Sequence, residues 1–205
     1  MKNEDIFLSK SQAAQDIFVY FMLNSNDGYF LDIGSYDPIK INNTYLLEKK
    51  GWNGLCIDVT DYTNQYSVLR TCEFTCKDLM RYNINDVLSE NNVPELIDYI
   101  SFDVDIATFK VLNDFDFNKY KFKVMTFEHD LYSGGGNKRK LSREILLKHG
   151  YKLLCSDICN DNNPFEDWWV NTNYIDENIY RLLECDQKEW NYIYDIIKNN
   201  IKDEN

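Results

Sequence analysis

Acidic side chains follow the apolar segments of this sequence at regular places, and one histidine stands among them. The residues at or directly after the ends of these segments are Asp32, Asp58, Asp78, Asp103 and the run Glu128-His129-Asp130. In open parallel sheets a ligand binds at the carboxyl ends of the strands. If the apolar segments are such strands, these side chains share one edge, where they can bind hydroxyl groups, hold a cation or accept a proton.

The first two acids have the spacing of a site for an adenosyl group. Gly34 follows Asp32 by two residues, and a glycine in this turn lets the backbone approach a ligand closely. The turn lacks the G-x-G-x-x-G pattern, so a pyrophosphate cradle and NAD are disfavoured. Asp58 lies 24 residues after Gly34, close to the roughly 20 expected for a carboxylate that binds ribose. The pattern favours S-adenosylmethionine; the alternative is a plain turn glycine with a surface aspartate.

His129 is the candidate general base. It is one of two histidines and follows a strand-like segment, so we expect its ring to emerge at the functional edge. An ordinary histidine pKa of about 6.5 suits proton transfer near neutral pH. The alternative is a histidine that is hydrogen-bonded to neighbouring backbone. His149 precedes Gly150 at the predicted end of a helix, where the helix dipole favours it, and we interpret it as structural.

Oxygen ligands for a divalent cation are predicted at the same edge. Asp103, Asp105, Glu128 and Asp130 can hold Mg²⁺ or Mn²⁺ with waters completing the shell, and Asp103 and Glu128 are the preferred ligands. The alternative is that these acids bind the hydroxyl groups of an acceptor directly. The six cysteines include two C-x3-C pairs, which differ from the usual C-x2-C zinc knuckle, so we interpret the cysteines as buried thiols.

Residues 133–140 combine glycine with positive charge. Three glycines precede Lys138, Arg139 and Lys140 in a chain whose net charge is −12. We hypothesise that this segment is a mobile lid, which guides an acceptor that carries phosphate or carboxylate. The alternative is a solvated loop.

The elements that must position these residues alternate between strand and helix patterns. Continuous apolar runs predict strands at residues 29–34, 54–59, 73–76, 96–103, 122–128, 151–156 and 167–170. Amphipathic periodicity predicts helices at residues 12–23, 43–50, 106–112, 141–149 and 178–201. Buried strands separated by helices imply an α/β fold with a mainly parallel central sheet and helices on both faces. No repeat or linker divides the chain, so residues 1–205 are predicted as one domain, with a core over about 11–171 and a helical C-terminal tail over 172–205.

The composition restricts the partners. Apolar residues make up 44% of the 205 and aromatic residues 15%, which excludes a disordered chain. The negative net charge repels phosphate backbones and anionic lipids, so nucleic acid and membrane surfaces are not expected partners. No apolar run approaches the roughly 18 residues of a membrane span, and the first ten residues lack the apolar part of a secretory signal. Together with reduced cysteines, these features favour a cytoplasmic protein.

Several segments, in this order and spacing, resemble the FkbM-type methyltransferases. They are Ser11-Gln12 with Gln15-Asp16, then residues 28–34 (GYFLDIG), 41–48 (INNTYLLE), 51–58 (GWNGLCID), 97–105 (IDYISFDVD) and 126–129 (TFEH). The resemblance covers about residues 11–171. It implies a class I, Rossmann-like methyltransferase that uses S-adenosylmethionine and transfers a methyl group to a hydroxyl of a sugar or glycan.

The resemblance also implies roles for individual residues. The predicted cofactor-binding residues are Gln12, Asp32, Gly34, Ser35, Asn43, Thr44, Asp58, Val59, Asp78 and Leu79. Among them, Asp32 and Gly34 would line the methionine half, Asp58 would bind ribose, and the segment around Asp78 would lie near adenine. The predicted catalytic residues are His129, Asp103 and Asp105.

The sequence departs from the family pattern twice. Pro38 stands where the family often has glycine, and Asp105-Ile106-Ala107-Thr108 replaces an acidic-Gly-Ala-acidic run, which removes one carboxylate. The change at Thr108 leaves a second hypothesis open, namely a non-catalytic adenosyl-binding module fused to or docked on a glycosyltransferase. A nucleotide-sugar or NAD enzyme on the same fold is disfavoured by the missing glycines.

Overall fold

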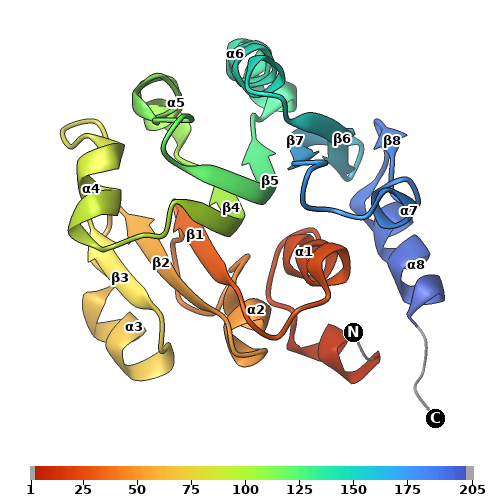
Figure 1. The fold of residues 1–205 in the computed structure, drawn as a ribbon, viewed down its shortest axis with the longest axis horizontal. Helices are drawn as coiled ribbons and strands as arrows, with labels where there is room; N and C mark the ends of the chain where they lie inside the picture. The colour runs from red at the N-terminus through yellow and green to blue at the C-terminus, as the bar shows by residue number, and fades with distance from the viewer. Residues whose placement is uncertain (1–2, 202–205) are drawn as a thin grey trace.

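A computed structural model describes residues 3–201 and shows a single eight-stranded sheet between two layers of helices (Figure 1). The strand order is β3-β2-β1-β4-β5-β7-β6-β8. The strands are β1 (Tyr29–Ile33), β2 (Asn53–Asp58), β3 (Glu73–Cys76), β4 (Leu96–Phe102), β5 (Lys121–Glu128), β6 (Lys152–Asn160), β7 (Asn163–Val170) and β8 (Cys185–Asp186). Strands β1 to β5 pair in parallel, whereas β7 runs antiparallel to both β5 and β6. The predicted α/β fold with a mainly parallel sheet is therefore confirmed.

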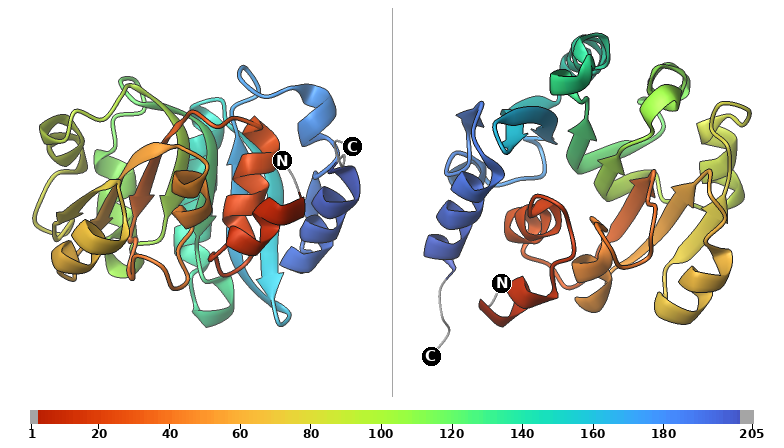
Figure 2. Two further views of the ribbon diagram at one scale, coloured as in Figure 1. Left: turned by 90° about the horizontal axis from the view of Figure 1, so that it is seen from below. Right: turned by 180° about the vertical axis from the view of Figure 1, so that it is seen from behind.

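The helices divide between the two faces of the sheet (Figures 1 and 2). Helices α1 (Gln15–Leu23), α2 (Tyr45–Lys49) and α3 (Thr63–Leu69) cover one face, and α4 (Ile84–Glu90), α5 (Thr108–Asp114) and α6 (Gly136–Lys148) cover the other. The C-terminal helices are α7 (Glu177–Tyr180) and α8 (Trp190–Asn200), and the described part of the chain also contains three 3₁₀ turns: η1 (Asn3–Leu8), η2 (Asp105–Ala107) and η3 (Leu131–Ser133). Among residues 3–201, no helix combines the length and the apolar character needed to cross a bilayer.

Two apolar clusters, one on each face, form the core. Because successive side chains of a strand point to opposite faces, neighbouring apolar residues belong to different clusters. Trp168 of β7 packs in the cluster under α1, where its ring stacks on Phe18 at 4.4 Å between centroids, whereas Trp169 packs in the cluster under α5 and α6. Both indoles are fully buried. This arrangement explains why the strands have continuous apolar runs.

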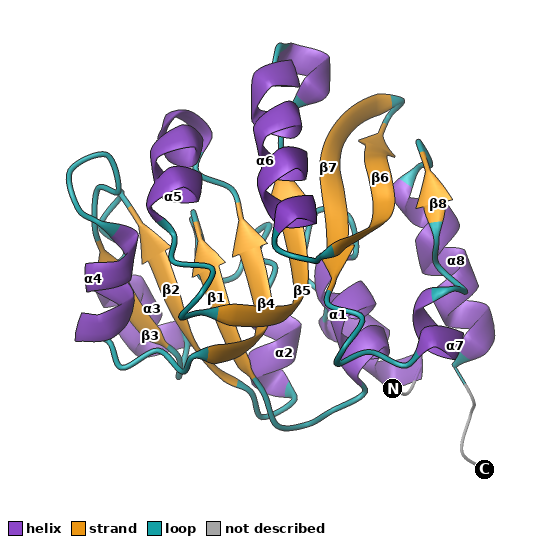
Figure 3. Cartoon of the chain, turned by 45° about the horizontal axis from the view of Figure 1, so that its top comes forward, coloured by secondary structure: helices purple, strands orange, loops and turns teal. Residues whose placement is uncertain are grey.

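The structure corrects several sequence-based boundaries. Residues 178–201 are not one amphipathic helix, because β8 interrupts them and pairs in parallel with β6 (Figure 3); residues 202–205 of the predicted tail lie outside the described part. Strands β6 and β7 extend beyond the predicted ranges into a hairpin, whose turn residues Asp161 and Asn162 have φ of 52° and 62°. Helices α3 and α4 were not predicted. Helix α3 buries Tyr66 alone, which gives no helical period. Helix α4 buries Ile84, Val87 and Leu88 at helical spacing, a signal that the sequence analysis missed in a helix of only seven residues.

Candidate functional site

A cavity of about 540 Å³ opens at the carboxyl ends of the parallel strands. Its wall comes from the segments that follow β1, β2, β3 and β4, as expected for a ligand site in an open parallel sheet. Apolar side chains from three of these segments, Val59, Leu79, Met80 and Ile106, line it together with polar residues, among them Asp58. The cavity therefore offers an apolar slot next to a carboxylate. Five predicted cofactor residues lie in its lining: Gly34, Asp58, Val59, Asp78 and Leu79.

Asp58 is held in a fixed orientation on this wall. Its Oδ2 atom accepts a hydrogen bond from the backbone N–H of Tyr36 at 2.8 Å, and its Oδ1 atom accepts one from Thr60 at 2.7 Å. Each carboxylate oxygen has a further lone pair. Asp58 can therefore accept two more hydrogen bonds from a ligand without being reoriented.

Gly34 is required by the protein's own backbone. Its φ is +89°, and a Cβ atom would lie 1.5 Å from the carbonyl oxygen of Asp103. The turn after β1 and the end of β4 therefore touch, which brings Asp103 next to the turn. The sequence suggested that this glycine makes room for a ligand; the structure shows that it makes room for the neighbouring strand end.

A second cavity, of about 140 Å³, adjoins the first through Gly34, Tyr36 and Asp103. The other polar residues that line it are Gln12, Gln15, Asp32, Ser35, Asn43 and Glu128. Buried atoms without a hydrogen-bond partner occur here, namely Ser35 Oγ and Asn43 Oδ1. Because unpaired buried polar atoms are costly, these two atoms are suited to pair with polar groups of a ligand.

Asp32 forms the floor of this second cavity. It is 2% exposed, and burial raises its pKa to about 6. Thr44 Oγ1 donates a hydrogen bond to Asp32 Oδ2 at 3.1 Å, and the buried Arg70 donates one to Thr44 Oγ1 at 3.2 Å. Thr44 itself is fully buried and lines neither cavity. The structure therefore places Thr44 behind Asp32, which it supports, and not in the wall of either cavity.

Asp103 and Glu128 face each other between the ends of β4 and β5. Their carboxyl groups are hydrogen-bonded to one another. Burial raises the pKa of Asp103 to about 6, with the charges of Asp105 and Asp130 adding to the effect. Burial and the nearby Asp103 raise the pKa of Glu128 much further. Two carboxyls in this arrangement hold one proton between them at neutral pH. Asp105, which was also predicted to be catalytic, is exposed and lies in the lining of the first cavity.

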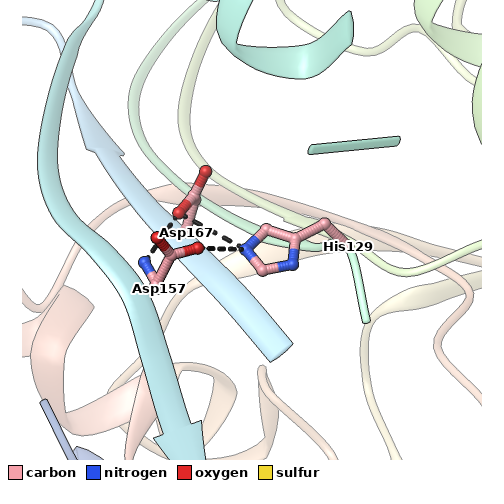
Figure 4. A group of neighbouring side chains, drawn as sticks. All are labelled: His129, Asp157 and Asp167. Atoms are coloured by element: carbon pink, nitrogen blue, oxygen red, sulfur yellow. Dashed lines mark hydrogen bonds and ion pairs between the residues drawn. The ribbon is translucent and has the colours of Figure 1, made fainter. Parts of the chain in front are cut away.

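His129 does not lie at the functional edge. It is fully buried, its Nδ1 atom accepts the backbone N–H of Leu131 at 3.2 Å, and its Nε2 atom lies 3.4 Å from Asp167 and 3.5 Å from Asp157 (Figure 4). It lines neither of the two cavities. The structure does not support His129 as the general base, because its ring lies against Asp157 and Asp167, whereas the neighbouring Glu128 lines the second cavity.

The group formed by His129, Asp157 and Asp167 has the residue types of a metal site, yet arginines already supply its positive charge. Arg143 binds both carboxylate oxygens of Asp167 at 2.7 Å. Arg139 binds both oxygens of Asp157 at 2.7 and 2.5 Å. Among the residues that the structure describes, this is the one group of three or more such ligands within reach of one another. We interpret it as a buried ion-pair network that joins α6 to the β6–β7 hairpin.

The predicted mobile lid is replaced by a helix. Helix α6 begins at Gly136, so Lys138, Arg139 and Lys140 lie in its first turns. Each is paired with an acid: Lys138 with Asp130 at 3.3 Å, Arg139 with Asp157, and Lys140 with Glu144 at 3.9 Å. A Cβ atom at Gly135 would lie 1.5 Å from the carbonyl oxygen of His129. This glycine therefore serves close packing, and the basic residues form no free phosphate-binding loop.

Two buried side chains near the carboxyl pair were missed by the sequence analysis. Gln15, at the start of α1, lines the second cavity and donates to Glu166 at 3.1 Å. Glu166 of β7 lies opposite Glu128 of β5 in the antiparallel ladder, and burial raises the pKa of Glu166 to about 8. Gln15 was visible in the family motif, but Glu166 lies outside every matched segment.

The fold is that of the S-adenosylmethionine-dependent methyltransferases. A TehB-like methyltransferase of this class from Corynebacterium glutamicum has a TM-score of 0.53 and 12% identity, over 78% of this chain and 89% of that one. Magnesium protoporphyrin IX methyltransferase from Synechocystis, solved with bound S-adenosylmethionine, has a TM-score of 0.54 and 14% identity, over 82% of each chain. Precorrin-6y C5,15-methyltransferase from Geobacter metallireducens has a TM-score of 0.50 and 13% identity, over 80% and 89%.

These similarities concern the fold. No protein-family model matches the sequence, and no curated protein matches it. The named structures act on different molecules, including a porphyrin and a precorrin. The acceptor of this chain must therefore be argued from its own site.

Proposed function

We propose that this protein is an S-adenosylmethionine-dependent methyltransferase that acts on a hydroxyl group of a sugar or glycan. The observation that carries the cofactor assignment is the pre-oriented Asp58 carboxylate, which lies at the end of β2 beside an apolar slot in a methyltransferase fold. The sugar acceptor is supported by the resemblance to FkbM-type methyltransferases and by the acidic character of the site.

The residues present fit this cofactor. Asp58 would accept both ribose hydroxyls, and the slot formed by Val59, Leu79 and Ile106 would hold adenine. The unpaired atoms Ser35 Oγ and Asn43 Oδ1 would meet the polar methionine end in the second cavity. When bound, S-adenosylmethionine supplies an electrophilic methyl group on a positively charged sulfur.

The protein must orient the acceptor hydroxyl and take its proton, because a sugar hydroxyl is a poor nucleophile. Asp103 is the group placed to do this. Asp103 lines both the first and the second cavity, and its carboxyl group shares a proton with that of Glu128, which lines the second cavity. We therefore assign to Asp103 the role that the sequence suggested for His129.

Cofactor binding tests the first part of the proposal. Asp58→Ala removes the acceptor of two hydroxyl hydrogen bonds, and leaving those groups weakly paired costs about 2–3 kcal/mol. We expect the Kd for S-adenosylhomocysteine, measured by calorimetry, to rise by about 30- to 150-fold. Asp61→Ala, an exposed acid in the following loop, is the matched control and should leave the Kd unchanged. An unchanged Kd for Asp58→Ala would remove Asp58 from the site.

A divalent cation at Asp103 and Glu128 is a separate proposal with its own test. Two facing carboxylates plus waters suit Mg²⁺ or Mn²⁺, and a cation would replace the proton that the pair now shares. If the pair holds such a cation in place of its proton, EDTA abolishes methyl transfer and either ion restores it, with tighter binding as the pH rises because the proton competes with the ion. Full turnover in EDTA would instead leave both carboxylates as direct partners of the acceptor.

A further inference from the structure

A third cavity, of about 130 Å³, continues the line of the first two. It shares Gln12 and Glu128 with the second cavity and is otherwise formed by the turn after β5 and by the β6–β7 hairpin turn. The three cavities thus follow one another along the carboxyl edge of the parallel strands. Glu128, whose partner is Asp103, lies at the junction of the second and third cavities.

The lining of the third cavity has the chemistry of a site for an uncharged polyol. Two amides, Asn160 and Asn163, and two carboxylates, Glu128 and Asp161, offer both donors and acceptors to hydroxyl groups. The ring of Tyr132, which is 57% exposed, supplies a flat apolar surface beside them. In residues 3–201, no lysine or arginine belongs to this lining.

Positive charge nearby is already neutralised. Lys138, in the first turn of α6, is bound to Asp130 at 3.3 Å. Asp161, the single negative charge of the Asp103–Glu128 pair and the net charge of −12 therefore repel a phosphate or carboxylate group. The sequence-based hypothesis of an anionic acceptor is not supported by this arrangement.

The hairpin turn that forms the cavity is fixed from behind by the C-terminal segment. Glu189 Oε1 accepts the backbone N–H of Asn162 at 2.7 Å. Trp190 Nε1 donates to Asn160 Oδ1 at 3.3 Å, which leaves the amide NH₂ of Asn160 for other partners. The turn is thus built into a defined shape before any ligand binds.

We propose that the third cavity is the acceptor subsite and that it binds an uncharged sugar ring, with Tyr132 against one face of the ring and the asparagines and acids around its hydroxyls. This inference rests on the proposed function, and it adds the location of the acceptor and the exclusion of phosphorylated or acidic sugars.

The test is saturation-transfer NMR on the full chain saturated with S-adenosylhomocysteine. The probes are the methyl glycosides of glucose, galactose, mannose, rhamnose and fucose, with glucose 6-phosphate as the anionic comparison. We expect at least one methyl glycoside to bind and Tyr132→Ala to weaken that binding by about tenfold. Tyr174→Ala, the same change at a 47% exposed tyrosine just after the far end of β7, should have no effect.

The outcomes separate this inference from the proposed function. Binding of S-adenosylhomocysteine is titrated independently on every variant, and Tyr132→Ala should leave it unchanged. Binding of that cofactor product without any glycoside signal that depends on Tyr132, or stronger binding of glucose 6-phosphate, overturns the acceptor subsite alone. A Tyr132-dependent glycoside signal without any binding of S-adenosylhomocysteine supports a sugar site here and overturns the methyltransferase.

Discussion

Asp103→Asn is expected to lower kcat by roughly 10²–10⁴, the usual weight of one general base, and to leave the affinity for S-adenosylhomocysteine nearly unchanged. The amide keeps the shape and can still hydrogen-bond to Glu128, but it cannot accept the acceptor's proton. Methyl transfer under saturating cofactor, together with calorimetry on the same variant, measures both quantities. An Asp103→Asn enzyme with near-normal kcat would contradict the assignment.

Glu128→Gln is the matched control for this role. A glutamine at position 128 still donates a hydrogen bond to Asp103, so the base is retained and kcat should fall far less than in Asp103→Asn. The pH profile of the unaltered enzyme follows from the same pair. Burial raises the pKa of Asp103 to about 6, and a carboxyl acts as a base only when ionised. Activity should therefore rise as the pH increases through about 6.

Asp167→Ala is expected to destabilise the fold by about 3–5 kcal/mol, the cost of leaving one partner of a buried ion pair without the other. Asp167 is fully buried, binds Arg143 through both oxygens at 2.7 Å, and accepts the backbone N–H of Asp157 at 2.9 Å. Urea unfolding followed by circular dichroism gives the free energy of unfolding. The exposed pair of Lys140 and Glu144 provides the control, since Lys140→Ala should change that free energy by less than about 1 kcal/mol.

The stabilisation by Asp167 should depend on pH. Burial alone would raise its pKa, but Arg143 and His129 hold the pKa of Asp167 below the ordinary value. A group whose pKa is lower in the folded state stabilises the fold above its unfolded-state pKa, about 3.9 for Asp, and loses that effect as the pH falls. The difference between Asp167→Ala and the unaltered protein should therefore shrink below about pH 4. A constant difference down to pH 2 would show that packing, not charge, carries the effect.

The sequence predicted the acidic edge of the sheet well, for a physical reason. Strands buried on both faces have apolar runs that end where the sheet ends, so Asp32, Asp58 and Asp103 could be placed at strand ends without any long-range information. The direction in which a side chain points at such a strand end was not predicted as well as its position. It depends on the alternation along the strand, which separates Glu128 from His129.

The partners of His129 could not be predicted. Asp157 and Asp167 lie on the β6–β7 hairpin, far along the chain, and only the antiparallel pairing of β7 with β5 brings them to the histidine. The glycines before α6 were misinterpreted for the same reason. Their composition suggested mobility, whereas Gly135 packs against the carbonyl of His129, a contact that has no signature in the local sequence.

The short strand β8 has a consequence for how this protein behaves in a crowded solution. An unpaired edge strand offers rows of N–H and C=O groups to which another chain can add, and this is a common route to aggregation. Here β8 and the residues after it cover the outer edge of β6. Cys185 of β8 lies opposite Cys155 of β6 in the parallel ladder, Gln187 N–H donates to Ser156 C=O at 2.8 Å, and Cys159 N–H donates to Lys188 C=O at 2.8 Å. The C-terminal segment thus protects this edge of the sheet from association with a second molecule, in addition to holding the turn of the β6–β7 hairpin.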